Sequence, residues 1–189
     1  PWIYGLISLI LLSAAACVVI SAFEIKSPVF HCLLSGLMVC FPAIVGNFCF
    51  MFTSAPYALA ILGACLAVWL FIAGGRLNCA GGVAILAVSL GIYQAYISLA
   101  ASLLVLSLLR MLLEGEKALP VLKRGIRYVL LLLVSLLVYY GVTFAVDSFS
   151  GKGYQEYEFM STGGIISSVL RAYSSFAHTL SDGYFGYVN

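Results

Sequence analysis

The chain has 189 residues, of which 63% are hydrophobic and 8% are charged, and its mean hydropathy is +1.13. Soluble domains carry about 25% charged residues, so this composition excludes a water-exposed globular fold. The formal net charge of +2 is small and the sequence contains no dense Lys/Arg tract, which sets nucleic-acid binding aside. A polytopic membrane protein remains.

Long uncharged stretches lie between clusters of charged residues. Asp, Glu, Lys and Arg are absent from residues 1–23, 27–75, 77–109 and 128–146. Each stretch can hold at least one membrane span of about 20 residues. We therefore expect an all-α fold, a polytopic transmembrane helix bundle of about five or six spans within residues 1–146. The expected spans are about 2–23, 29–50, 57–72, 80–92, 95–113 and 128–146.

Local sequence sets the expected ends of the second and third spans. Pro42 should kink the second span, because proline removes a helix hydrogen bond. Residues 53–56, Thr-Ser-Ala-Pro, are interpreted as a short turn before the third span. After that span come Gly74, Gly75, Arg76 and Asn78, which are interpreted as helix-stop and loop residues.

The uncharged stretch 77–109 is ambiguous. As one helix it would be about 50 Å long, well beyond a hydrocarbon core of about 30 Å. It either tilts and protrudes as one helix or breaks near residues 91–96. In favour of one helix, Gly91, Ala95, Ser98 and Ser102 form a face of small residues that would let a continuous helix pack closely on a neighbour. With a break, seven of the nine basic residues fall on one side: five between 110 and 127, together with Lys26 and Arg76. Cytoplasmic loops carry an excess of Lys and Arg, so we favour the hairpin.

Residues 147–189 differ in character from the rest. Acidic residues, Ser, Gly and Tyr are frequent there, and no stretch is long and apolar enough to span. Apolar residues at helical spacing predict an extracytoplasmic amphipathic helix at about 163–180. The chain begins with Pro1 and has neither a basic n-region nor a cleavage site. We interpret it as a fragment of a longer protein that lacks the N-terminal and C-terminal parts.

The motif inventory is mostly negative. The sequence has no Walker motif, GxGxxG, HExxH or GxSxG, and no Cys/His spacing of a zinc site. We predict no metal and no cofactor.

Two polar features stand out. Tyr93-Gln94-Ala95-Tyr96 places an amide and two phenols inside or at the edge of the bilayer, where polar groups tend to mark a cavity. Gln94 either lines such a cavity or bonds a neighbouring helix. The outer segment 147–182 combines carboxylates with aromatic rings, which suits a sugar-handling site or a solvated loop.

The residues also resemble a known family. The segment 89–98, Ser-Leu-Gly-Ile-Tyr-Gln-Ala-Tyr-Ile-Ser, follows Phe41-Pro42 and the segment 50–60, Phe-Met-Phe-Thr-Ser-Ala-Pro-Tyr-Ala-Leu-Ala. Together they resemble the bacterial integral-membrane glucosyltransferases of Gtr type II, over roughly residues 29–146. This family glucosylates O-antigen and related surface polysaccharides.

The resemblance implies a GT-C-like enzyme of the bacterial cytoplasmic (inner) membrane. Such an enzyme takes glucose from a polyprenyl-phosphate carrier and transfers it to a surface polysaccharide or lipid-linked acceptor on the extracytoplasmic side. It implies that Tyr57, Tyr93, Gln94 and Tyr96 bind substrate, and that Arg171 on the outer helix pairs with phosphate. The family's catalytic base is usually an acidic residue in the first outer loop. Residues 1–24 supply no outer acidic residue, so the base is unknown and expected outside this fragment.

Two other classes of protein fit the pattern. A transporter or lipid-linked sugar flippase would also place Gln and Tyr near the midplane at a broken helix. No internal repeat is visible in the sequence, which favours the enzyme. A structural or assembly subunit is the third interpretation, and it predicts that replacing Gln94 by Leu is silent.

Overall fold

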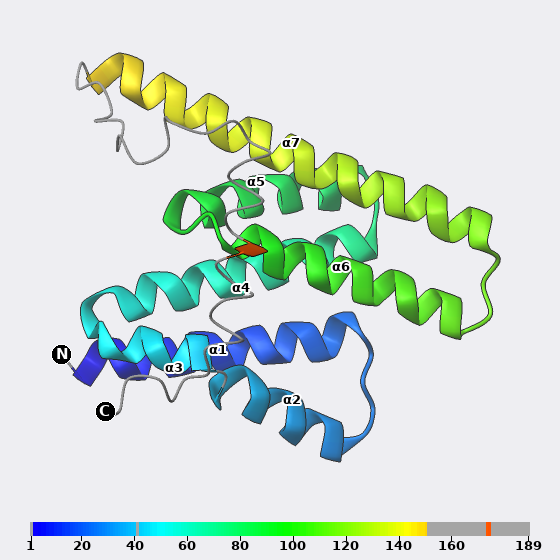
Figure 1. Ribbon diagram of the computed structural model, residues 1–189, viewed down its shortest axis with the longest axis horizontal. Coiled ribbons are helices and arrows are strands. Elements are labelled where there is room, and N and C mark those ends of the chain that lie inside the picture. Colours follow the sequence, from blue (N-terminus) through cyan, green and yellow to red (C-terminus); the bar gives the residue numbers. More distant parts are fainter. Residues whose placement is uncertain (1, 41, 151–172, 175–189) are drawn as a thin grey trace. The chain divides into compact units, whose positions relative to one another are not determined.

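The computed structural model describes residues 2–40, 42–150 and 173–174. All regular secondary structure in these ranges is α-helical, so the predicted all-α fold is confirmed. The elements, drawn in Figure 1, are α1 (Trp2–Ala22), α2 (Pro28–Cys40), α3 (Pro42–Cys49), α4 (Met51–Ala73), α5 (Arg76–Ile92), α6 (Tyr96–Leu113) and α7 (Ala118–Ser150). The chain divides into two compact units, residues 1–146 and 147–189. The expected helix at 163–180 lies outside the described residues except for 173–174, which are helical.

Four of these helices are long and apolar enough to cross a membrane. They are α1, α4 from Phe52, α6, and α7 as far as Val146. The apolar α5 has 17 residues and is about 26 Å long at 1.5 Å per residue, at the short end of the range for a membrane span. The protein is therefore a membrane protein built as a helix bundle.

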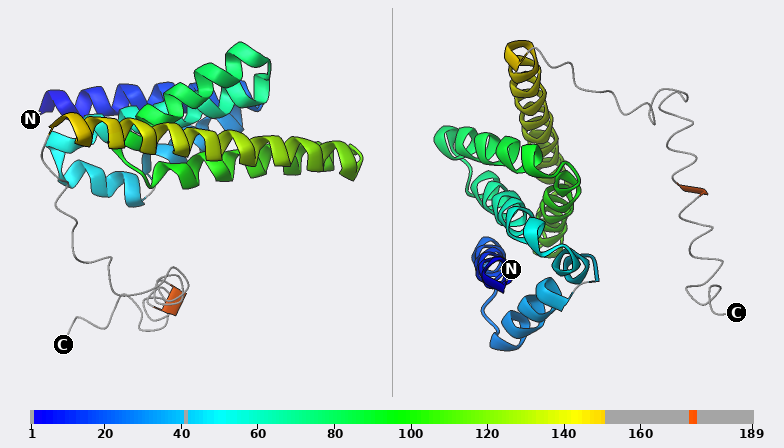
Figure 2. Two further views of the ribbon diagram at one scale, coloured as in Figure 1. Left: turned by 90° about the horizontal axis from the view of Figure 1, so that it is seen from above. Right: turned by 90° about the vertical axis from the view of Figure 1, so that its left-hand side faces the viewer.

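Helix α4 lies at the centre of the first unit. It contacts α1, α3, α5 and α6, and Figures 1 and 2 show α1 on one side of it and α5 on the other. Its buried face is rich in alanine, and small residues let membrane helices approach each other closely. These buried residues are Ala58, Ala60, Ala64 and Ala67.

The core consists of two clusters that share α4. One cluster joins α1 to α4 and contains Leu12, Ala15, Val19, Ala58, Ile61 and Cys65. The other joins α4 to α5, α6 and α7 and contains Ala64, Ala67, Val68, Phe71, Leu86, Leu90, Ala100, Leu104 and Tyr128. Because α4 contributes to both, it holds the two clusters together as one bundle.

Two buried serine contacts fix the register of the helices on α4. Ser8 Oγ on α1 donates to Ser54 Oγ on α4 at 2.9 Å. Ser89 Oγ on α5 donates to the carbonyl oxygen of Ala60 at 2.7 Å. Hydrogen bonds between membrane helices contribute about 0.6 kcal/mol on average, so these bonds specify alignment more than they add stability.

Helices α4 and α5 approach each other closely at Gly82. A Cβ atom at this position would lie 2.6 Å from Phe71 Cε1 and 3.2 Å from the carbonyl oxygen of Ala67. The Phe71 ring is 1% exposed and is enclosed by the core. The observed spacing of the two helices therefore requires glycine at residue 82.

The structure describes the expected second span in two parts and corrects the start of the third. Residues 28–40 and 42–49 are helical, as α2 and α3, and Phe41 between them lies outside the described residues. The expected kink at Pro42 therefore stays a prediction. The predicted turn at 53–56 is wrong: these residues belong to α4, with Pro56 inside the helix. The buried contact of Ser54 with Ser8 helps to keep this end helical.

Polar and basic residues that were expected in loops begin the next helices. Arg76 and Asn78 open α5, and only Gly74 and Gly75, with φ of 72° and 87°, separate it from α4. Asn78 Nδ2 donates to the carbonyl oxygen of Gly74 at 2.7 Å. Likewise α7 begins at Ala118, ten residues before the expected start. Long basic side chains extend to the membrane surface from a helix end, so a basic sequence does not prevent helix formation.

Helix α7 packs through a narrow seam. Its buried residues are Val121, Tyr128 and Ser135, which recur every seventh position. A seven-residue repeat places residues on one side of a helix. The remaining surface of α7 is rich in exposed Leu and Val, which suits contact with lipid.

Replacing Gly82 by Ala is expected to destabilise the bundle by about 1–3 kcal/mol, because the added methyl group overpacks the α4–α5 contact. Thermal unfolding of the purified chain in detergent measures the effect. Gly91→Ala in the same helix is the control, since a Cβ there meets no atom within 4 Å. Equal melting temperatures for the two variants would contradict the close approach.

Candidate functional site

A short turn connects α5 to α6 at residues 93–95. Tyr93 is extended, with φ of −155° and ψ of 111°, while its N–H still bonds the carbonyl oxygen of Ser89 at 3.0 Å. The Tyr96 N–H then bonds the Tyr93 carbonyl oxygen at 3.3 Å and begins α6. The structure thus breaks the long apolar stretch where the hairpin is expected, and Gln94 lies exposed at the end of the bundle.

Three tyrosines meet around this turn. The ring of Tyr57, on α4, lies 5.0 Å from that of Tyr93 between centroids, and the Tyr93 ring lies 5.1 Å from that of Tyr96. These distances fall in the range of favourable aromatic pairs. Tyr93 is 45% exposed. The three rings therefore form an aromatic surface that a ligand can reach.

Helix α7 contributes a fourth tyrosine. Gln94 Nε2 donates to Tyr139 Oη at 2.6 Å, and the Tyr139 ring lies 5.2 Å from that of Tyr140. A carboxamide has two N–H donors and an acceptor oxygen. One bond to Tyr139 orients the amide and leaves the rest of its hydrogen-bonding capacity for a ligand. We refer to Tyr57, Tyr93, Gln94, Tyr96 and Tyr139 as the tyrosine–glutamine cluster.

The structure brings together four of the five residues predicted to bind substrate. Tyr57, Tyr93, Gln94 and Tyr96 are neighbours, whereas Arg171 lies outside the described residues. The sequence did not identify Tyr139 as a member of the cluster. The available signal was a pair of tyrosines, Tyr139 and Tyr140, toward the C-terminal end of the last span, but sequence alone does not show which helix lies beside the turn.

The charged side chains that the structure describes gather at the other end of the bundle. Among the side chains that the structure describes, the carboxylates are Glu24, after α1, and Glu114 and Glu116, after α6. No group of three His, Cys, Asp or Glu residues in the described part of the chain could hold a metal ion. The cluster thus offers aromatic faces, phenols and an amide, which are groups for binding and orienting a polar ligand.

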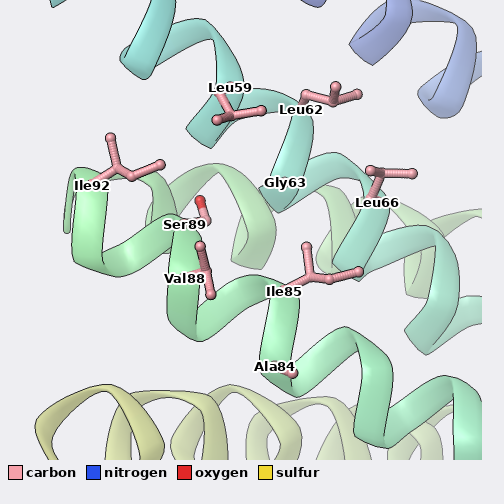
Figure 3. A pocket seen from close by; sticks show the side chains of 9 residues that line it. All are labelled: Leu59, Leu62, Gly63, Leu66, Ala84, Ile85, Val88, Ser89 and Ile92. Carbon is pink, nitrogen blue, oxygen red and sulfur yellow. The ribbon is translucent and has the colours of Figure 1, made fainter. Parts of the chain in front are cut away.

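An apolar groove of about 350 Å³ runs between α4 and α5 (Figure 3). Its lining is Leu59, Leu62, Gly63, Leu66, Ala84, Ile85, Val88, Ser89 and Ile92. Of these nine residues only Ser89 has a polar side chain, and its hydroxyl is bonded to α4. Figure 3 places Leu59 and Ile92 toward one end, and these residues are close in sequence to Tyr57 and Tyr93. The groove therefore leads toward the tyrosine–glutamine cluster.

The comparison with protein families gives a match over nearly the whole chain. The model of the family described as glucosyl transferase GtrII matches residues 1–188. No curated protein and no solved structure matches the chain. The family match extends well beyond residues 29–146, the region in which the sequence resemblance lies.

The Gln94–Tyr139 bond should be measurable as a coupling between the two side chains. Gln94→Leu and Tyr139→Phe each remove the same hydrogen bond, so the double variant should be more stable than additivity predicts, by about 1 kcal/mol. Thermal unfolding of the four proteins in detergent gives this value. A control cycle combines Gln94→Leu with Tyr140→Phe. It should show no coupling, because Gln94 bonds Tyr139. Additive effects in both cycles would contradict the bond.

Proposed function

Because the chain belongs to the GtrII glucosyltransferase family, we propose that it moves glucose from a polyprenyl-phosphate carrier to a cell-surface polysaccharide, such as O-antigen. Family membership makes the protein a glucosyltransferase. The carrier, the acceptor and the site of transfer, at the extracytoplasmic face of the bacterial cytoplasmic membrane, are the proposal. Its main support is the position of the tyrosine–glutamine cluster at the end of an apolar groove.

The distribution of basic residues supports transfer on the extracytoplasmic side of the membrane. Seven of the nine basic residues lie at or near one set of helix ends: after α1, at the start of α5, at the end of α6 and in the first turns of α7. Lys and Arg favour the cytoplasmic side. The tyrosine–glutamine cluster lies at the opposite helix ends, at the start of α4 and between α5 and α6. It would therefore face the extracytoplasmic side.

The groove supports a lipid-linked donor. A polyprenyl chain is hydrocarbon and remains in the bilayer, so the protein must meet its phosphate and sugar at the membrane edge. The branched side chains of Leu62, Ile85 and Val88 offer such a chain an apolar surface. The head of a chain that lay between α4 and α5 would emerge near Tyr57 and Tyr93, at the aromatic surface.

The cluster suits a pyranose. The apolar face of a sugar ring packs on an aromatic side chain, and exposed Tyr93 provides one. Sugar hydroxyls donate and accept hydrogen bonds, as the amide of Gln94 does. Arg171 remains the proposed partner of the phosphate, because a guanidinium binds phosphate oxygens through paired N–H donors.

Transfer needs a base that the described carboxylates cannot supply. The acceptor hydroxyl oxygen forms a bond to the anomeric carbon, the bond from that carbon to the phosphate oxygen breaks, and the hydroxyl proton passes to a carboxylate. Glu24, Glu114 and Glu116 lie at the end of the bundle remote from the cluster. We therefore place the base outside the described side chains.

Transfer of radiolabelled glucose from synthetic polyprenyl-phosphate-glucose to membrane polysaccharide tests the proposal. Gln94→Leu should lower the transfer rate about tenfold, because it removes one hydrogen bond to the substrate worth about 1.4 kcal/mol. Tyr93→Ala should lower it about three- to tenfold through the lost ring contact.

Tyr4→Ala is the matched control, because Tyr4 lies at the cluster end of α1 and is 49% exposed, against 45% for Tyr93. It should leave transfer unchanged. Absence of transfer by the unaltered full-length protein would refute the donor assignment and favour a transporter or flippase. Equal losses of transfer rate in Tyr4→Ala and Tyr93→Ala would contradict the placement of the substrate site at the tyrosine–glutamine cluster.

A further inference from the structure

A second cavity lies at the charged end of the bundle, away from the tyrosine–glutamine cluster. Its volume is about 170 Å³, and it is bounded by the ends of α1, α4 and α6 and the start of α7. A water molecule occupies about 30 Å³ of the liquid, so the space equals about five or six waters. That size suits a small polar group and is too small for a nucleotide.

The cavity has a buried floor and a charged rim. Tyr128 and Ser107 are 4% and 8% exposed and form the floor. Glu24, Glu114 and Arg124 also line the cavity, but they are exposed. The cavity thus opens through a rim that carries both signs of charge.

Arg110 is committed to holding the cavity walls together. It donates to the carbonyl oxygen of Phe23 and, through Nε, to Glu114 Oε1 at 2.7 Å. Its other terminal nitrogen lies 3.7 Å from Glu24 Oε2. These contacts tie the end of α1 to α6 and make Arg110 part of the wall, with little capacity left for a ligand.

Arg124 and Glu24 keep capacity for a ligand. Arg124 donates to the thioether sulfur of Met111 at 3.4 Å, and a thioether is a weak acceptor, so a phosphate oxygen would be a much better partner. Glu24 is 75% exposed and its contact with Arg110 is long, at 3.7 Å. Its carboxylate can accept hydrogen bonds from an ammonium group.

The backbone at Glu24 is unusual for a residue with a side chain. Its φ is +49°, in the left-handed region that helix ends usually assign to glycine. The Ile25 N–H bonds the carbonyl oxygen of Ile20 at 3.1 Å, which closes the end of α1 around this residue. Glutamate at this position costs conformational energy that glycine would avoid, and it places a carboxylate on the rim.

The position of the cavity along the helices suits contact with lipid headgroups. The apolar span of α6 ends at Leu113 and α7 begins at Ala118, so the cavity is near the basic ends of both helices, which the orientation proposed above makes cytoplasmic. Headgroups occupy a layer directly outside the hydrocarbon core, and basic pockets between membrane helices on this side bind lipid headgroups. Here the rim adds a carboxylate to the guanidinium.

We propose that this cavity binds the phosphoethanolamine headgroup of a membrane lipid, with the phosphate on Arg124 and the primary ammonium on Glu24. A zwitterionic headgroup matches a rim of both signs better than an anionic one, which Glu24 and Glu114 would repel. The ammonium has three N–H donors for the carboxylate, whereas the quaternary ammonium of phosphocholine has none. The site should therefore discriminate between these two headgroups of equal charge.

Native mass spectrometry of the full chain, delipidated in detergent, measures binding of phosphatidylethanolamine, phosphatidylcholine and phosphatidylglycerol with identical acyl chains. Phosphatidylethanolamine should bind about fivefold more tightly than either of the others. Arg124→Gln should weaken the binding of phosphatidylethanolamine about fivefold, because it removes one exposed charge contact. The control is Lys123→Gln, which should have no effect because Lys123 is adjacent but does not line the cavity. Glu24→Gln should abolish the preference over phosphatidylcholine.

Melting temperatures of all variants establish that each is folded. Equal weakening by Arg124→Gln and Lys123→Gln would overturn the site in favour of general attraction to basic residues. Tightest binding of phosphatidylglycerol would overturn the zwitterion assignment. Glycerophosphoethanolamine, which has the headgroup without acyl chains, should not displace the lipid at equal concentration. Displacement would overturn the assignment to a membrane lipid in favour of a free headgroup.

Discussion

The close approach of α4 to α1 and α5 is the constraint on which the rest of the structure depends. Lipid tails are as apolar as the helices, so no hydrophobic driving force holds membrane helices together, and their association relies on van der Waals contact and a few hydrogen bonds. The alanines of α4 and the absence of a side chain at Gly82 allow that contact. The distance between α4 and α5 in turn determines how near Tyr57 comes to Tyr93, so packing in the bundle sets the geometry of the candidate site.

The two ends of the bundle carry different chemistry. At one end, Arg110 joins the end of α1 to α6 through ionic and hydrogen-bonded contacts. At the other end, tyrosine rings and one amide meet, and the contacts are aromatic or between neutral groups. The charged end suits lipid headgroups and the cytoplasmic surface. The aromatic end, next to an apolar groove, suits a sugar on a lipid carrier, and it is consistent with membership of a glucosyltransferase family.

The sequence predicted the features that depend on local chemistry and missed those that depend on tertiary packing. The all-α membrane fold follows from composition, and the resemblance to the Gtr type II family is confirmed by the family match. The position of the break near Gln94 followed from helix length and charge distribution. The helical start of α4 was missed because Pro56 signals a turn locally, whereas Ser54 is packed against α1. Tyr139 was missed because only the fold shows that α7 passes the α5–α6 turn.

The central claim is that α5 and α6 form a hairpin whose turn faces the outside of the cell. Single cysteines at Ala95, in the turn, and Glu116, after α6, test it most directly, because both positions are exposed. The native cysteines are first replaced by alanine, and intact cells are treated with a membrane-impermeant maleimide. The account predicts that the cysteine at residue 95 is labelled in intact cells and that the one at residue 116 is labelled only after permeabilisation. Labelling of both from the same side, or the reverse order, would contradict it.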